Sequence, residues 1–137
     1  MQAGSKNNFL IQKEILLLHR FIFEFMITDL SYLQQMTGNE REVMNEMIEL
    51  FLNQLTEMRE DIDLLANSKN WIELSRMAHK IKSSALVMGI VQMADEMKEL
   101  ELLAKEGKNV EKYPDYVAHF KALADLAEVE LKTYLDG

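Results

Sequence analysis

The sequence of 137 residues contains no cysteine, one proline and five glycines. Without cysteine the chain can form no disulfide, thiolate metal site or thiol nucleophile, and it suits a reducing compartment such as the cytoplasm. The scarcity of proline and glycine leaves few positions at which a helix must end. No segment of useful length alternates apolar and polar residues as a half-buried strand does. The sequence therefore predicts an all-α protein.

Basic residues are also in the minority. The chain has 15 Lys and Arg against 23 Asp and Glu, which gives a formal net charge of −8. Phosphate backbones and anionic lipid surfaces recruit Lys and Arg, so this balance argues against a nucleic-acid partner and against docking on anionic lipid. The partners that remain are proteins and small molecules.

The length fits one compact domain, and a hydrophobic content of 48% is enough for a core. The most apolar stretch, Phe9 to Ile27, is interrupted by the polar residues Lys13, Glu14, His19, Arg20 and Glu24. Such a stretch is a poor membrane span and is expected to form a helix that is buried or covered by a partner. We divide the chain into an N-terminal extension or linker helix, residues 1–27, and a helical domain, residues 28–137.

Apolar residues at alternating spacings of three and four predict the helices of this domain. The first helix follows Gly38, with Asn39 and Glu42 as a capping box. Its stripe is Met44, Ile48, Phe51, Leu55, Met58, Ile62 and Leu65. The second opens with a capping box of Asn70 and Glu73. Its stripe is Leu74, Met77, Ala78, Ile81, Ala85 and Met88.

Two further stripes lie beyond Gly89. The third helix is marked by Ile90, Met93, Met97, Leu100 and Ala104, and the fourth by Tyr116, Phe120, Leu123, Ala127, Leu131 and Leu135. Four amphipathic helices with short connections pack most simply as an antiparallel up-down-up-down bundle. A short helix near residues 29–36, and the apolar segment before it, would add one or two N-terminal helices.

One face of the second helix is basic, although the chain as a whole is acidic. At 100° per residue, His79 lies about 160° from the centre of the apolar stripe, so it is predicted to face solvent. Its neighbours on that face are Ser75, Arg76, Lys82 and Ser83. Together Arg76, Lys80 and Lys82 form a basic cluster that suits an anion on the imidazole, although an ordinary surface histidine is the simpler alternative.

The run from His79 to Ala85 reads His-Lys-Ile-Lys-Ser-Ser-Ala, and Gly89 comes ten positions after the histidine. It resembles the signature of histidine-containing phosphotransfer (HPt) domains: a His, a Lys three positions on, two small residues and a Gly at the tenth position. The resemblance extends over residues 28–107 and more loosely over the last helix. Ser83 stands where the family often has glycine. Further matching positions are Phe51, Ala78, Leu100, Glu101, Ala104, Lys105, Glu106 and Gly107.

The resemblance implies a phosphorelay intermediate. A receiver domain's phospho-aspartate donates its phosphoryl group to His79, at the ring nitrogen farther from the backbone, and a second receiver accepts it. Lys82 then neutralises charge on the phosphoryl oxygens, while Ser83 and Ser84 are small enough for close docking. Gly89 is assigned to a helix end or close packing rather than to the phosphate. Glu101 either orients the imidazole or is a solvated glutamate.

The partners implied are response-regulator receiver domains and a hybrid sensor histidine kinase, with Mg²⁺ supplied by the receiver and no cofactor in this chain. The sequence has no Gly-rich phosphate loop, so direct use of ATP is unsupported, and a phosphocarrier rather than an enzyme is expected. A cytoplasmic monomer is the simplest form. Whether the chain is free-standing or part of a hybrid kinase stays open.

Two other functions were considered. A carboxylate-bridged metal enzyme in a helical bundle needs Glu three residues before a His, and none of His19, His79 and His119 has one. A docking module that binds a receiver without being phosphorylated is the stronger alternative. The presence of both His79 and Lys82 argues for phosphotransfer instead.

Overall fold

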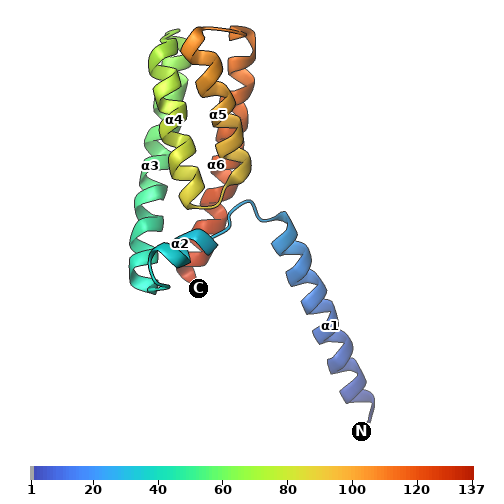
Figure 1. The fold of residues 1–137 in the computed structure, drawn as a ribbon. Helices are drawn as coiled ribbons and strands as arrows, with labels where there is room; N and C mark the ends of the chain where they lie inside the picture. Colours follow the sequence, from blue (N-terminus) through green and yellow to red (C-terminus); the bar gives the residue numbers. More distant parts are fainter. Residues whose placement is uncertain (1) are drawn as a thin grey trace.

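The computed structural model describes the backbone of residues 2–137 and the side chains of residues 7–18, 20 and 25–137. Its elements are α1 (Gln2–Phe25), α2 (Ser31–Met36), α3 (Arg41–Asn67), α4 (Trp71–Val87), α5 (Val91–Glu106), η1 (Val110–Lys112) and α6 (Tyr113–Asp136). Helices α3 to α6 run alternately up and down as a bundle, and α2 lies across one end of it (Figure 1). No strand occurs in residues 2–137, so the predicted all-α four-helix bundle is confirmed.

The core forms because the predicted stripes face one another. Helix α3 packs against α4 and α6, and α5 packs against the same two helices. The fully buried side chains come from all four bundle helices and from α2, and include Leu33, Ile48, Leu55, Leu74, Ile81, Met97, Leu100, Phe120 and Leu131. Burial of this apolar surface is the main stabilising term of the fold. It fixes the rotation of each helix, and therefore which side chains point outward.

The helix starts agree with the sequence prediction at one place and differ at another. The Asn70 side chain accepts a hydrogen bond from the Glu73 backbone N–H, so Asn70 caps α4 as predicted. The predicted cap at Asn39 is wrong, because the N-cap of α3 is Glu40. Asn39 has a left-handed φ of 62° and its N–H donates to the Gln34 carbonyl at 2.8 Å. It ends α2 instead of starting α3, as residues in this conformation commonly do.

Helix α1 projects away from the bundle (Figure 1). Its apolar side chains between Phe9 and Leu18 are 45–69% exposed, so a helix buried within this chain is the wrong interpretation for them. Cover by a partner stays a prediction. In the described part of the chain, no helix has both the length and the apolar content to cross a membrane.

The segment between α1 and α2 is anchored on the bundle. The backbone N–H groups of Ile27 and Thr28 donate to the Glu130 carboxylate of α6 at 3.0–3.1 Å. The Asp29 N–H donates to the Met88 carbonyl at 3.2 Å. Gly89 lies directly beneath this segment with a φ of 65°, and a Cβ there would be 1.9 Å from the Asp29 carbonyl oxygen. The predicted close-packing role of Gly89 is confirmed.

Candidate functional site at His79

His79 lies near the middle of α4, on the face opposite the core. The neighbouring Ala78 and Ile81 are buried in the bundle, and their burial fixes the rotation that turns His79 outward. The His79 side chain is 58% exposed. The predicted exposure of this histidine is confirmed, and a partner can reach its ring.

Glu101 of α5 contacts His79 across the boundary between the two helices. Its Oε1 lies 2.7 Å from Nδ1 of His79, and its Oε2 lies 3.1 Å from Nζ of Lys82. Burial raises the pKa of the Glu101 carboxyl, but the hydrogen bonds and charges of Lys82 and His79 outweigh it and place the pKa below its ordinary value. Glu101 is therefore an anion that accepts from both side chains, which supports the orienting role over that of a solvated glutamate.

This contact selects one form of the neutral imidazole. A carboxylate can only accept, so the short contact requires a proton on Nδ1 of His79. The lone pair of the neutral ring is then on Nε2, the nitrogen farther from the backbone. Among the described residues, none forms a hydrogen bond with Nε2. Nε2 thus carries a lone pair on a side chain that is 58% exposed.

Lys82 lies one turn after His79 and is more enclosed. Its side chain is 22% exposed, and its Nζ is 3.4 Å from Nδ1 of His79. Since Nδ1 carries a proton, this second contact brings a cation near the ring without a hydrogen bond to it. Lys82 is thus the predicted cation whose ammonium group contacts a ring nitrogen of His79.

Among the described residues, the other predicted site residues form no hydrogen bond or ion pair with the His79 ring. Arg76 forms an ion pair with Glu73, and Lys80 is exposed without a recorded contact to His79. The Ser83 hydroxyl donates to the His79 carbonyl oxygen at 3.1 Å, so it turns back to its own helix. Ser84 is half-buried, and Gly89 is at the end of α4. The basic cluster is therefore looser than the sequence suggested.

Ser75 was predicted on the solvent face, and this is wrong. It is 7% exposed, because its hydroxyl donates to the Glu101 carbonyl oxygen at 2.9 Å and α5 covers it. The bond joins α4 to α5 one turn before His79. It thereby sets the height of Glu101 relative to the imidazole.

A hollow of about 340 Å³ adjoins His79 between α4 and α5. It is lined by Ile72, Ser75, Arg76, His79, Glu101 and Lys105. The sequence analysis did not assign Lys105 to the site. Its position four residues after Glu101, and so on the same face of α5, is the signal that could have found it. The hollow combines two cations with an apolar side chain beside an exposed nucleophile.

The model of the Hpt domain family matches residues 46–135 of the chain. This region runs from the first turns of α3 to the end of α6 and includes His79, Lys82 and Glu101. The chain belongs to the Hpt domain family. Neither curated proteins nor solved structures gave a match. Hpt domains are phosphocarrier modules of two-component systems.

In this Hpt domain the described residues contain no group of three His, Asp or Glu side chains that could ligate a metal ion. The chemistry that the site itself offers is that of an imidazole with a free Nε2, a carboxylate on Nδ1 and one adjacent ammonium group. An imidazole that reacts at Nε2 while Nδ1 keeps its proton becomes positively charged, and the carboxylate on Nδ1 can balance that charge.

Proposed function

We propose that this Hpt domain is a phosphorelay intermediate. His79 accepts a phosphoryl group from the phospho-aspartate of a receiver domain and passes it to an aspartate of another receiver. The observation that carries the proposal is the pairing of an exposed His79 ring with Glu101 through Nδ1. It leaves Nε2 as the atom that meets an incoming phosphorus.

The transfer step follows from this geometry. The Nε2 lone pair forms a bond to phosphorus, the bond from phosphorus to the aspartyl oxygen breaks, and the aspartate leaves as a carboxylate. The phosphorylated imidazole keeps the proton on Nδ1 and carries a positive charge, which Glu101 balances at 2.7 Å. The reverse step delivers the phosphoryl group to the second receiver. Positioning and charge balance supply most of the catalysis of such transfers.

Lys82 is proposed to stabilise the phosphoryl oxygens. Its Nζ is already within 3.4 Å of the ring, and rotation of its flexible side chain brings the ammonium group from Glu101 toward the new anion. The Mg²⁺ ion that such transfers use would be bound by the receiver, outside this chain.

The receiver would dock on the face around His79. Ile72 and Leu86, about two turns before and after His79 on α4, are each 53% exposed and flank it with apolar surface. Ser83 is exposed one turn beyond the histidine and adds little bulk. Arg76 and Lys105 line the hollow and complement the acidic pocket of a receiver.

The domain division is part of the same proposal. Residues 28–137 would form the phosphotransfer bundle, and residues 1–27 an extension to it. The exposure of the apolar side chains of α1 supports this division, as does the anchoring of the bundle's first residues by Glu130. The proposed unit would act in the cytoplasm, where receivers and hybrid kinases present their phospho-aspartates.

The test is incubation with a radiolabelled phosphorylated receiver, comparing the wild type with His79→Gln and His119→Gln. His119 is a matched control, since it is also exposed and also lies beside a glutamate, Glu96, at 3.5 Å. We expect acid-labile, base-stable label on the wild type and on His119→Gln, and none on His79→Gln. Receiver binding without label on any form would contradict phosphotransfer and support the docking module.

A further inference from the structure

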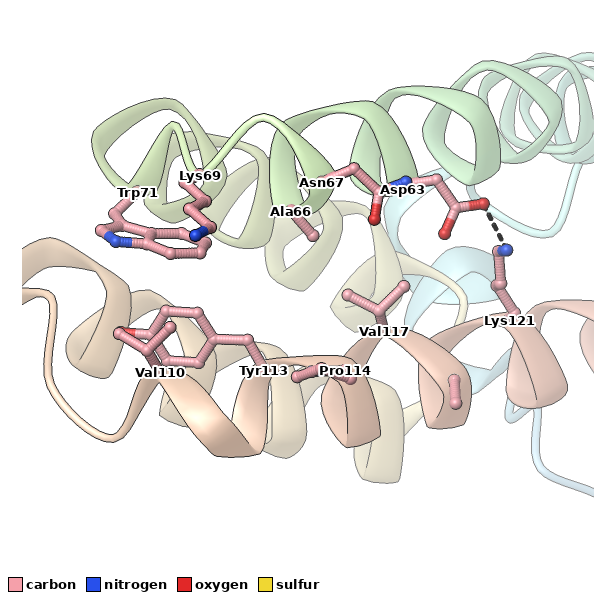
Figure 2. Close-up of a pocket in the computed structure, with 11 residues that line it drawn as sticks. Asp63, Ala66, Asn67, Lys69, Trp71, Val110, Tyr113, Pro114, Val117 and Lys121 are labelled. Atoms are coloured by element: carbon pink, nitrogen blue, oxygen red, sulfur yellow. Dashed lines mark ion pairs between the residues drawn. The ribbon is translucent and has the colours of Figure 1, made fainter.

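A second cavity, of about 410 Å³, is separate from the His79 hollow. It is bounded by the last turns of α3, the first residue of α4, η1 and the start of α6. Figure 2 shows Trp71 and Lys69 on one wall and Val110, Tyr113 and Val117 on the other. The two cavities share no lining residue.

Two aromatic rings form a rigid corner of this cavity. Trp71 and Tyr113 meet edge to face, with their centroids 5.0 Å apart and an interplanar angle of 83°. The Tyr113 hydroxyl donates to the carbonyl oxygens of Leu103 and Lys108 at 2.9 and 2.7 Å, which fixes the ring. Tyr113 is 1% exposed and closes the base of the cavity, so the apolar surface left to a ligand is the part-buried Trp71 ring with Val110 and Pro114. Val117 extends the apolar wall along α6.

Two lysines line the cavity, and they differ in whether they form an ion pair. Lys121 forms an ion pair with Asp63, which closes one end of the cavity in Figure 2. Lys69 is exposed and has no ion-pair partner among the described residues. The turn holds Lys69 at a φ of 58°, and Lys69 lines the cavity next to Trp71. Lys69 is thus a cation still available to an anionic ligand, in a chain of net charge −8.

We propose that this cavity binds a small carboxylic acid with an aromatic or branched aliphatic tail. The volume lies in the range of small-molecule sites, about 300–1,000 Å³, and an apolar lining with few polar groups is their usual composition. The tail would contact Trp71, Val110 and Pro114, and the carboxylate would pair with Lys69. The inference does not depend on phosphotransfer, because the cavity is formed without any residue of the His79 site.

Trp71 is the only tryptophan of the chain, so fluorescence excited at wavelengths that tyrosine does not absorb reports on Trp71 and its cavity. The full chain is titrated with 3-phenylpropionate, 3-phenylpropylamine and propionate. We expect a saturable change with 3-phenylpropionate, with a dissociation constant on the order of 1 mM or tighter for a ligand of this size. The amine lacks the anion and propionate lacks the ring, so neither is expected to saturate.

Three variants test how the cation and the volume of the cavity contribute to the binding of 3-phenylpropionate. Lys69→Met removes the cation and is expected to weaken binding about fivefold. Ala118→Leu fills the cavity from an exposed lining position and is expected to abolish binding with the helical content unchanged. Lys98→Ala, an exposed lysine of α5 away from the cavity, is the control and is expected to bind as the wild type does.

Absence of a saturable change with 3-phenylpropionate would overturn the proposal. Equal binding of the acid and the amine, or an unchanged affinity in Lys69→Met, would overturn the assignment of Lys69 and of the ligand's charge. Label transfer to His79 is measured on the same variants. Its failure in the wild type would contradict the phosphorelay role and leave the result for this cavity unaffected.

Discussion

Glu101 of α5 contacts His79 of α4 with Oε1 2.7 Å from Nδ1. The same carboxylate accepts from Lys82 through its other oxygen at 3.1 Å. One side chain from a neighbouring helix therefore orients the imidazole, selects its tautomer and positions the nearest cation. The chemistry of the site depends on the alignment of α4 with α5, which the Ser75 hydroxyl bond to the Glu101 carbonyl maintains.

Glu101→Ala is expected to slow phosphoryl transfer to His79 by about tenfold to a hundredfold, because a hydrogen bond to a charged group contributes about 1.5–3 kcal/mol. Glu101→Gln keeps an oxygen that accepts from Nδ1 but removes the charge that balances the phosphorylated ring, so its rate should lie between those of the wild type and Glu101→Ala. Nitrogen NMR of the His79 ring separates orientation from fold stability, since only loss of the acceptor raises the population of the Nε2–H tautomer. Glu96→Ala, which removes the partner of His119, is the control. An unchanged tautomer and rate in Glu101→Ala would contradict the orienting role.

Lys82→Glu is expected to slow transfer more than tenfold, because it places a negative charge where the phosphoryl oxygens arrive. Lys80→Glu reverses a charge on the same helix at an exposed position without a recorded contact to His79, and it should have a much smaller effect. Transfer rates from a phosphorylated receiver, with circular dichroism to verify the helices, make the comparison. Equal rates in the two variants would show that Lys82 has no special role.

Gly89→Ala is expected to destabilise the domain by at least about 2 kcal/mol, for two reasons. Alanine is strained in the left-handed conformation, and its Cβ would also collide with the Asp29 carbonyl. Gly38 is the matched control, since its φ is 64° and nothing lies within 4 Å of a Cβ there. Gly38→Ala should therefore cost only about 1–2 kcal/mol. Urea unfolding measures both, and equal losses would contradict the close-approach role of Gly89.

The lowered pKa of Glu101 predicts a pH dependence of stability. The interactions of its carboxylate are present in full above the ordinary pKa of 4.5 and are lost as the pH falls through the lower pKa of the folded state. The difference in unfolding free energy between the wild type and Glu101→Gln should therefore shrink as the pH falls from about 5 toward 3. A difference that does not change with pH would show that the charge of Glu101 contributes nothing.

The sequence predicted the bundle because the spacing of apolar residues reports which helix face is buried. This is why the stripe from Met44 to Ile62 and the exposure of His79 were both correct. The cap at Asn70 was also predictable, since the left-handed residue that follows α3 is Lys69, which leaves the Asn70 side chain to cap α4. At Asn39 the end of one helix and the start of the next compete for the same residue, and the end prevails.

The spacing of apolar residues did not predict which side chains of neighbouring helices contact one another. The period of α4 placed Ser75 on the outer face, but α5 covers that part of the face and buries the hydroxyl. Glu101 could be assigned only through the family resemblance, because the spacing of apolar residues within each helix does not predict how far α5 is shifted along α4. The apolar content of α1 predicted a helix but could not identify what covers it.

The proposed phosphotransfer requires phosphorylation of His79 at Nε2 with the proton on Nδ1. The most direct test is phosphorus and nitrogen NMR of the ¹⁵N-histidine-labelled protein after charging by a phosphorylated receiver. We predict a single phosphohistidine with phosphorus bonded to Nε2 of His79, and the signals of His19 and His119 unchanged. Phosphorus on Nδ1 of His79, or on another histidine, would contradict the account.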